Sequence, residues 1–300
     1  MSTGVAGVAF APATPATPGG RSDAPPAPPG ADLDALRAGL RSLGTVVVAF
    51  SGGADSAFLA AVATDTLGAA RVSCVTAVSP SLAPEELDDC RALAAEWGLH
   101  HLEVRTGELA DPAYAANDGS RCYHCKASLM AAVGPVVEAA GPTATVVLGV
   151  NLDDLGDHRP GQTAAAERGA RFPLVDAGFT KADVRAWSRR LGLRTWDKPA
   201  AACLASRVPY GTPVTITTLD AVARAESALR ALGFRQLRVR HYGDTARIEV
   251  PADEMATVVE ARRAVSAAVH AAGYRYVTLD LDGFRSGNLN DSLPTTEATP

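Results

Sequence analysis

The stretch from residue 45 to residue 56 reads T-V-V-V-A-F-S-G-G-A-D-S, and its two halves predict different structures. The first half is an apolar, β-branched run, which predicts a buried strand over residues 45–50. The second half is a Gly-Gly turn that leads into an Ala-rich helix, expected over residues 56–67. Glycine lets the backbone approach a ligand closely, and the N–H groups at a helix start point at anions, so this turn predicts a phosphate-binding loop.

Strand–helix alternation continues along the chain from this loop. We expect further strands over residues 72–78, 102–104 and 146–150, and helices over 84–97 and from Thr180, whose N-cap box pairs it with Asp183, to about Leu191. This alternation is typical of a parallel sheet with helices on both faces. After Ser206 the pattern predicts a smaller α+β unit, with helices over 219–232 and 255–272 and strands over 237–239, 246–250 and 276–281.

The sequence therefore predicts an α/β domain over residues 31–205 and an α+β, substrate-binding domain over 206–290. Residues 1–30 are rich in Ala, Pro and Gly and cannot pack a core, so we expect disorder there and in residues 291–300. The first 30 residues also lack the basic start and continuous apolar centre of a signal peptide.

Composition narrows the class of protein. The 300 residues carry a formal net charge of -5, so nucleic acid is an unlikely partner unless a local basic patch exists. No apolar run approaches the ~18 residues that span a bilayer, so we expect a cytoplasmic protein without a membrane partner. The five cysteines are odd in number and follow no secretory signal, which favours metal binding or catalysis over disulfides.

The phosphate loop differs from the common P-loop because it has no Gly-Lys-Ser/Thr ending. It resembles the S-G-G-x-D-S signature of the PP-loop ATP pyrophosphatases, an adenine nucleotide alpha hydrolase-like family that cleaves ATP to AMP and pyrophosphate. The candidate nucleotide-binding residues are Ser51, Gly52, Gly53, Asp55 and Ser56, and the resemblance adds Thr76 at the end of the second strand. The alternative is an ordinary Gly-Gly turn between a strand and a helix.

Carboxylates near this nucleotide site predict magnesium. Asp55 is an anion, so we expect it to act through Mg²⁺ or to fix the loop. Asp153 and Asp154 follow the strand at 146–150, where they are candidates to hold Mg²⁺ on the phosphates. The alternative for Asp153 and Asp154 is a solvated acidic turn.

Three cysteines stand out from the other two. Cys122 and Cys125 form a C-x-x-C, which by itself fits a redox pair, half a zinc site or part of an iron–sulfur site. With Cys203 they give three thiolates, a set that suits a [4Fe–4S] cluster with one open iron. Cys203 is also a candidate nucleophile toward an acyl adenylate, with Arg207 as the neighbouring cation that lowers its pKa. The remaining alternative for Cys203 is a small buried residue; Cys74 and Cys90 are expected in the core.

Longer strings carry a more specific resemblance, which runs from about residue 33 to 290. R-C-Y-H-C-K (121–126), N-L-D-D-L-G-D-H-R-P-G (151–161), W-D-K-P-A-A-A-C-L-A-S-R-V-P-Y-G-T (196–212), R-V-R-H-Y-G-D-T-A-R-I-E-V (238–250) and Y-V-T-L-D-L-D-G-F-R-S-G (276–287) together resemble the LarE sulfur transferases. The resemblance implies adenylation of a carboxylate of pyridinium-3,5-biscarboxylic acid mononucleotide and its conversion to a thiocarboxylate, for the nickel-pincer cofactor of lactate racemase. Its three-cysteine pattern favours sulfide delivery by a [4Fe–4S] cluster over sacrifice of Cys203, which ends as dehydroalanine in some members.

The expected partners are the small mononucleotide substrate and further copies of the chain in a homo-oligomer. Arg238 and Arg240 alternate on one strand and so face one side, where two guanidiniums can clamp the substrate phosphate. The alternative is an exposed strand face. Two other functions stay open at this point: a tRNA-thiolating PP-loop enzyme, which would need a basic RNA surface, and a non-catalytic nucleotide sensor, which would not need the cysteines.

Overall fold

The structure is a computed structural model that describes residues 30–155 and 160–285. Except for Gly30, the tails predicted to be disordered, residues 1–30 and 291–300, lie outside these ranges.

The first sheet confirms the predicted α/β class. Its four strands are all parallel in the order β3-β2-β1-β4. They are β1 (Val46–Ala49), β2 (Val72–Val78), β3 (His101–Arg105) and β4 (Thr145–Leu148). Order and direction together place a topological switch point between β1 and β4, where an open parallel sheet binds its ligands at the carboxyl ends of the strands.

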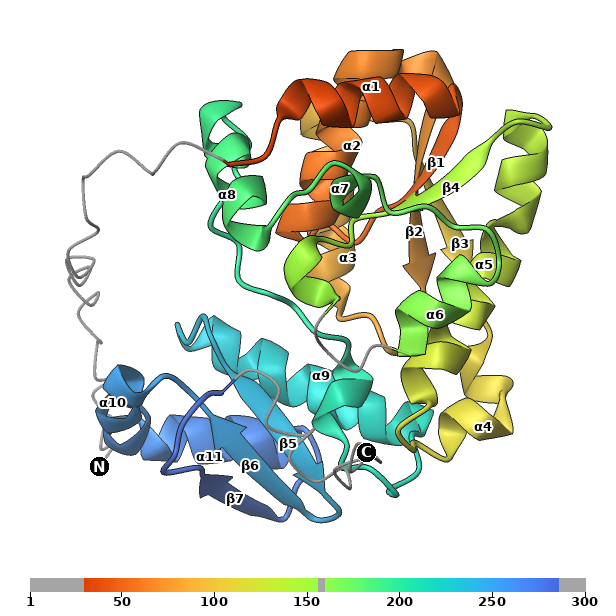
Figure 1. The fold of residues 1–300 in the computed structure, drawn as a ribbon. Helices are drawn as coiled ribbons and strands as arrows, with labels where there is room; N and C mark the ends of the chain where they lie inside the picture. The colour runs from red at the N-terminus through yellow and green to blue at the C-terminus, as the bar shows by residue number, and fades with distance from the viewer. Residues whose placement is uncertain (1–29, 156–159, 286–300) are drawn as a thin grey trace, which may run out of the picture.

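Helices cover both faces of this sheet (Figure 1). Val46 and Val48 of β1 pack on one side and Val47 on the other, as alternation along a strand requires. The first side is covered by α1 (Leu33–Leu43), α2 (Ala54–Leu67), α3 (Pro84–Trp97), α7 (Pro173–Asp176) and α8 (Lys181–Arg190). The second is covered by α5 (Arg121–Ala140) and α6 (Pro160–Ala166). The near-continuous apolar run of β1 reflects this burial on both faces.

A second sheet of three strands lies in the C-terminal part (Figure 1). Strands β5 (Arg238–Tyr242) and β6 (Thr245–Glu249) form an antiparallel hairpin closed by Gly243 and Asp244, and β7 (Tyr276–Leu279) pairs with β6 in parallel. Gly243 has φ of 60°, a conformation that glycine adopts readily in a two-residue hairpin turn. Helices α9 (Ile216–Ala231) and α11 (Arg262–Ala271) supply apolar residues to the core on one face of this sheet.

The prediction of a single helix over residues 255–272 is wrong. The structure has two helices, α10 (Met255–Glu260) and α11, separated at Ala261, whose ψ of 8° lies outside the α-helical range. Neither glycine nor proline marks this break. The apolar spacing of Val258, Val265 and Val269 is the same for one helix or two, so periodicity gave no sign of it.

An apolar cluster spans the predicted domain boundary at residue 205. Tyr114 lies in α4 (Pro112–Ala115), and Leu204 and Ala205 belong to the short helix η4 (Leu204–Arg207). They pack together with Leu219 and Val222 of α9. The division of the chain at this residue stays a prediction, but the two sheets are joined here by a shared core. None of the helices in the described ranges has the length and apolar character that crossing a membrane requires.

Candidate active site

The loop over residues 51–56, called the PP-loop below, leaves the carboxyl end of β1 and enters α2. Gly52 has φ of 67°, and a Cβ at this position would lie 2.8 Å from Cys90 Sγ, so a side chain fits neither the backbone nor the space. Within the described part of the chain, the N–H groups of Gly52, Gly53 and Ala54 donate to no protein acceptor. Three consecutive free N–H groups at a helix start form an anion-binding site.

The two serine hydroxyls hold the PP-loop in shape. Ser56 Oγ accepts from Ser51 N at 3.1 Å, lies 3.0 Å from Ser51 Oγ and donates to Gly53 O at 3.2 Å. The sequence suggested these hydroxyls as phosphate donors. In the structure they are engaged within the loop, so the backbone supplies the free donors.

The switch point between β1 and β4 fixes the other side of the PP-loop. A Cβ at Gly149, directly after β4, would lie 2.7 Å from Ser56 N and 2.8 Å from Asp55 C, so only glycine allows this approach. Asn151, which is 1% exposed, donates from Nδ2 to Asp55 Oδ1 at 3.0 Å. Burial raises the pKa of Asp55 above its usual value, although the Asn151 hydrogen bond and nearby Lys181 oppose the shift.

The proposed magnesium ligands lie close to Asp55 but are partly engaged. Asp153 Oδ2 accepts from Lys181 N at 2.6 Å, and Asp154 Oδ2 accepts from Asn151 N at 3.1 Å. Among the residues described, no three Asp, Glu, His or Cys side chains are assembled as a metal-binding group. The carboxylates of Asp55 and Asp154 are near enough to raise the pKa of Asp55 further, so a divalent cation would relieve their repulsion.

Thr76 lies beside the PP-loop with its hydroxyl already bonded. Thr76 Oγ1 donates to Phe50 O at 2.7 Å and lies 2.8 Å from His101 Nε2. Since the single hydroxyl proton goes to the carbonyl, Nε2 of His101 is the donor to Thr76 Oγ1. Thr76 therefore holds the strand end that leads into the loop, and its expected role in lining the nucleotide stays a prediction.

The C-x-x-C lies in the first turn of α5, with Cys122 exposed and Cys125 half-buried. Gly161 of α6 packs against this turn, because a Cβ there would lie 2.9 Å from both Cys122 O and Lys126 Cγ. Burial raises the pKa of Cys125 to about 12 despite nearby Lys126, and the Cys203 and Cys122 thiolates add to the rise. The three thiols thus share one region, but within the described residues they are not assembled as a metal-binding group. Cys74 and Cys90 are buried, as expected.

Three buried arginines hold the backbone around Cys203. Residues 199–207, called the Cys203 loop below, present the exposed Cys203 directly before η4. Arg207 Nη1 donates to Ala202 O and Cys203 O at 2.7 and 3.1 Å. Arg121 Nη1 donates to Ala205 O at 2.9 Å, and Arg240 Nη1 to Ser206 O at 2.7 Å. The carbonyl oxygens of the loop are fixed while the Cys203 side chain faces outward.

Arg207, the predicted partner of the Cys203 thiolate, is committed elsewhere. Its guanidinium pairs with both carboxylate oxygens of the buried Glu226, at 2.8 and 3.1 Å, and touches Cys203 through the main-chain carbonyl. Arg121 is a cation near these cysteines: burial works to lower its pKa, but Cys203, Cys122, Tyr210 and Tyr114 together raise it.

Arg238 and Arg240 share a face of β5, yet their surroundings differ. Arg240 is 1% exposed and donates to both oxygens of buried Glu249 at 2.9 Å. Arg238 is almost as buried but has no carboxylate in ion-pair contact within the described residues; it donates to Arg285 O at 3.2 Å and stacks 4.6 Å from the Phe284 ring. Burial, with Arg207 and Arg240 nearby, lowers the pKa of Arg238 to about 10. An unpaired buried cation is a candidate anion site.

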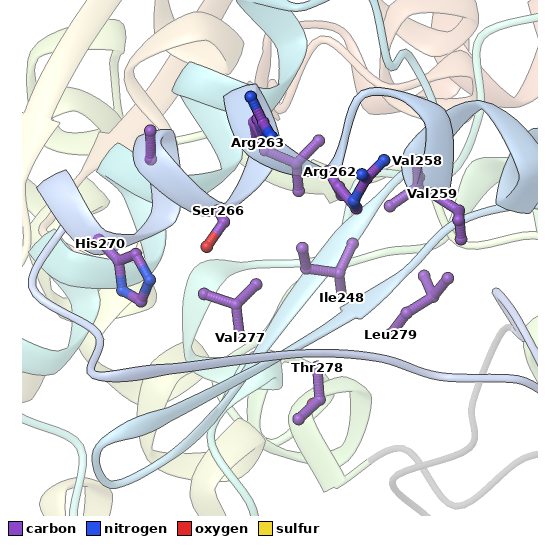
Figure 2. Close-up of a pocket in the computed structure, with 12 residues that line it drawn as sticks. Ile248, Val258, Val259, Arg262, Arg263, Ser266, His270, Val277, Thr278 and Leu279 are labelled. Carbon is purple, nitrogen blue, oxygen red and sulfur yellow. The ribbon is translucent and has the colours of Figure 1, made fainter.

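A groove of about 680 Å³ lies away from these residues, between α10 and α11 on one side and β6 and β7 on the other. Figure 2 shows Ile248, Val277 and Leu279 facing the helices across this groove. Arg262, Arg263 and His270 are its charged or titratable lining residues. None of the residues predicted for the active site lines it.

Comparison with known proteins places these features in a family. The NAD synthase family model matches residues 34–126, which contain the PP-loop and the C-x-x-C. A pyridinium-3,5-bisthiocarboxylic acid mononucleotide synthase of Lactiplantibacillus plantarum is 40% identical over 258 residues, 86% of this chain and 93% of the relative. This chain belongs to the LarE family of sulfur transferases. Its PP-loop superfamily domain implies ATP with Mg²⁺.

Two other similar proteins are named only as uncharacterised. One from Synechocystis is 46% identical over 263 residues, 87% of this chain and 97% of the relative. Another from Methanocaldococcus jannaschii is 25% identical over 244 residues, 80% of this chain and 91% of the relative.

Sequence reasoning about this LarE-family chain missed several residues of the site. Glu226, Asn151 and Lys198 are polar residues whose partners lie far along the chain, and no local pattern marks them. Arg121 had a signal, because it directly precedes the first cysteine of the C-x-x-C. A cation next to a cysteine pair would have been a better candidate for thiolate stabilisation than Arg207.

Proposed function

We propose that this protein is an ATP-dependent sulfur transferase that converts a carboxylate of pyridinium-3,5-biscarboxylic acid mononucleotide to a thiocarboxylate. The relative that is 40% identical over most of the chain is named for the bisthiocarboxylic acid product. The observation that carries the proposal is the presence, in one chain, of a backbone anion site at a helix start and an exposed cysteine whose own carbonyl is fixed.

The first step is adenylation. A substrate carboxylate oxygen attacks the α-phosphorus of ATP, the bond to the β-phosphate oxygen breaks, and pyrophosphate leaves with the negative charge. The free N–H groups of Gly52, Gly53 and Ala54 would bind that charge at the start of α2, where the helix dipole also favours it. Mg²⁺ bound with ATP would neutralise the phosphates near Asp55 and Asp154, with Asp153 close by.

The second step replaces the activated oxygen with sulfur. In the simplest route the Cys203 thiolate attacks the acyl carbon and AMP leaves, which gives a thioester. Removal of the Cys203 Hα then breaks the Cβ–S bond, so that the thiocarboxylate leaves and dehydroalanine remains. Arg121 is a cation close enough to interact electrostatically with this thiolate, and Arg207 donates a hydrogen bond to the Cys203 carbonyl.

The alternative sulfur source is the [4Fe–4S] cluster predicted from Cys122, Cys125 and Cys203. It stays a prediction, because the thiols share a region but are not assembled as a ligand set within the described residues. A cluster would supply sulfide that is not part of the chain, so turnover would not consume Cys203. Iron and acid-labile sulfide in protein purified without oxygen decide between the two routes.

Substrate binding is proposed to use Arg238 more than Arg240. Among the residues that the structure describes, Arg238 is buried without a carboxylate in ion-pair contact, so a phosphate would restore its charge balance, whereas Arg240 is already paired with Glu249. The predicted homo-oligomer also stays a prediction.

The test supplies the mononucleotide and ATP-Mg²⁺ and measures AMP, pyrophosphate and thiocarboxylate together. The wild-type protein should give all three. Cys203→Ala should still release pyrophosphate and yet form no thiocarboxylate. Formation of ADP and phosphate, or thiocarboxylate formation by Cys203→Ala, would show that the proposed chemistry is wrong.

A further inference from the structure

Lys198 connects the PP-loop to the chain that carries Cys203. Its side chain is 17% exposed, and its ammonium donates to Gly52 O at 3.2 Å, Glu86 Oε2 at 2.8 Å and Asp89 Oδ2 at 2.6 Å. An ammonium has three protons, so all of its donors are used. Burial works to lower the pKa of Lys198, but Asp89 and Glu86 outweigh burial and raise it, so the charge is retained.

The contact with Gly52 O fixes the direction of a PP-loop donor. The Gly52–Gly53 peptide is trans, as are all peptides in the described residues, so its C=O and N–H point in opposite directions. Because Lys198 holds the carbonyl, the Gly53 N–H points away from Lys198, and it is one of the three donors without a protein acceptor. Lys198 thus orients one donor of the anion site, but its ammonium has no further N–H to donate to the anion itself.

The acidic face of α3 holds the segment that contains Lys198. Asp89 accepts from both Lys198 and Arg194, and Glu96 accepts from Arg194 at 2.8 Å. Lys198 and Arg194 therefore form ion pairs with three carboxylates of α3. These are the carboxylates of Glu86, Asp89 and Glu96. Of the two cations, Lys198 alone also touches the PP-loop, which makes Arg194 a matched control.

Residues 199–203 follow Lys198 directly and are all exposed. The next fixed points are the carbonyls of Ala202 and Cys203, which accept from Arg207, and Leu204, whose N–H donates to Ser81 O at 2.8 Å beyond the end of β2. Cys203 therefore lies at the end of a five-residue exposed stretch with one anchor on the PP-loop and the other beside β2. A change in the Gly52–Gly53 peptide on phosphate binding moves the first anchor of this stretch.

We propose that Lys198 is a positioning residue that couples occupancy of the PP-loop by phosphate to the placement of Cys203. The coupling rests on the proposed function, since it links the adenylation site to the sulfur-bearing residue. It gives the enzyme a means to adjust the position of the exposed Cys203 when nucleotide is bound.

The test measures two properties of the full chain, with ATP-Mg²⁺ and no mononucleotide: ATP affinity by calorimetry, and iodoacetamide modification of Cys203 by peptide mass spectrometry. In the wild-type protein ATP should change the Cys203 modification rate. Lys198→Met should weaken ATP binding about tenfold, the effect of one charge-assisted hydrogen bond. It should also abolish the response of Cys203 to ATP.

Arg194→Met and Glu86→Gln are the controls, because both alter the same ion-pair group and leave the Lys198–Gly52 contact in place. Both should keep the ATP affinity and the Cys203 response, and Lys198→Arg should restore part of each. Thermal unfolding of all variants checks that they are folded. The coupling is refuted if Lys198→Met responds to ATP as the wild type does, or if the wild-type rate ignores ATP. Neither result depends on turnover, so a wild-type protein that couples but releases no pyrophosphate with substrate would count against the proposed function alone.

Discussion

The PP-loop and the Cys203 loop hold their backbones in opposite ways. The PP-loop leaves three N–H groups free and engages its hydroxyls internally, so its main chain is available to a ligand. In the Cys203 loop, the carbonyl oxygens of Ala202, Cys203, Ala205 and Ser206 are bound by buried arginines. The PP-loop offers its backbone N–H groups to an anion. The Cys203 loop has its backbone held in place, and it presents the Cys203 side chain for reaction.

The difference shows that arginines near a site need not bind the substrate. Arg207 and Arg240 are paired with buried Glu226 and Glu249, respectively, so their charges are balanced within the protein. Arg238 and Arg121 are also buried but have no carboxylate in ion-pair contact within the described residues; Arg121 instead donates to Asn117 Oδ1 and Ala205 O. The prediction that an arginine of β5 binds the substrate phosphate therefore has more support for Arg238 than for Arg240, whose charge Glu249 balances.

The largest expected effect is on the PP-loop side. Asp55→Ala should abolish pyrophosphate release, since the carboxylate that faces Asn151 and the Mg²⁺ region is lost. The fold should be retained, because burial already disfavours the ionised form of this side chain. Pyrophosphate assays and circular dichroism measure the two properties. A variant that still releases pyrophosphate at the wild-type rate would remove Asp55 from the site.

The two β5 arginines test the comparison directly. Arg240→Met removes the guanidinium that pairs with both oxygens of Glu249, which is 0% exposed and also contacts Arg247 at 3.2 Å, so the free energy of unfolding should fall by about 3 kcal/mol. Arg238→Met should change stability little but weaken mononucleotide binding by about 2 kcal/mol, as for a lost charge-assisted contact. Denaturant unfolding and calorimetry separate the effects. Equal losses of stability in both variants would make Arg238 part of the scaffold.

A smaller effect is expected where α6 packs on the first turn of α5. Gly161→Ala places a methyl group against Cys122 O and the Lys126 side chain, which should reduce stability by about 1–3 kcal/mol. Gly39→Ala is the control, because it lies within α1 with no atom within 4 Å of the added Cβ and should stabilise by roughly 0.5–1 kcal/mol. Thermal unfolding measures both. A neutral Gly161→Ala would show that the two helices can separate at no cost.

The smallest effect concerns the order in which the thiols react. The thiolate is the nucleophile, and burial raises the pKa of Cys125 to about 12, so its reactive fraction stays very small at pH 8 and grows as pH rises toward that value. Iodoacetamide should therefore modify exposed Cys122 and Cys203 well before Cys125. Peptide mass spectrometry across pH 7–10 follows each site. Early modification of Cys125 would mean that this turn of α5 opens in solution.

Much of the nucleotide side could be predicted because its information is local. The apolar run, the Gly-Gly turn and the helix that follows are contiguous, and backbone geometry alone converts them into an anion site. The C-terminal strands and α9 followed from periodicity in the same way. The break at Ala261 could not be predicted, because it leaves the apolar spacing unchanged and has no glycine or proline.

By itself the sequence determined the parallel-sheet class and the position of the PP-loop, since each is a property of neighbouring residues, and it singled out three candidate cysteines whose role stays a prediction. Only the tertiary structure decided which charges are free. The pairing of Arg207 with Glu226, of Arg240 with Glu249 and of Lys198 with Gly52 joins residues separated by 19, 9 and 146 positions, respectively. Whether an arginine holds a substrate or a carboxylate of its own chain depends on such long-range contacts, because burial makes an unpaired charge costly and the fold determines which partner is within reach.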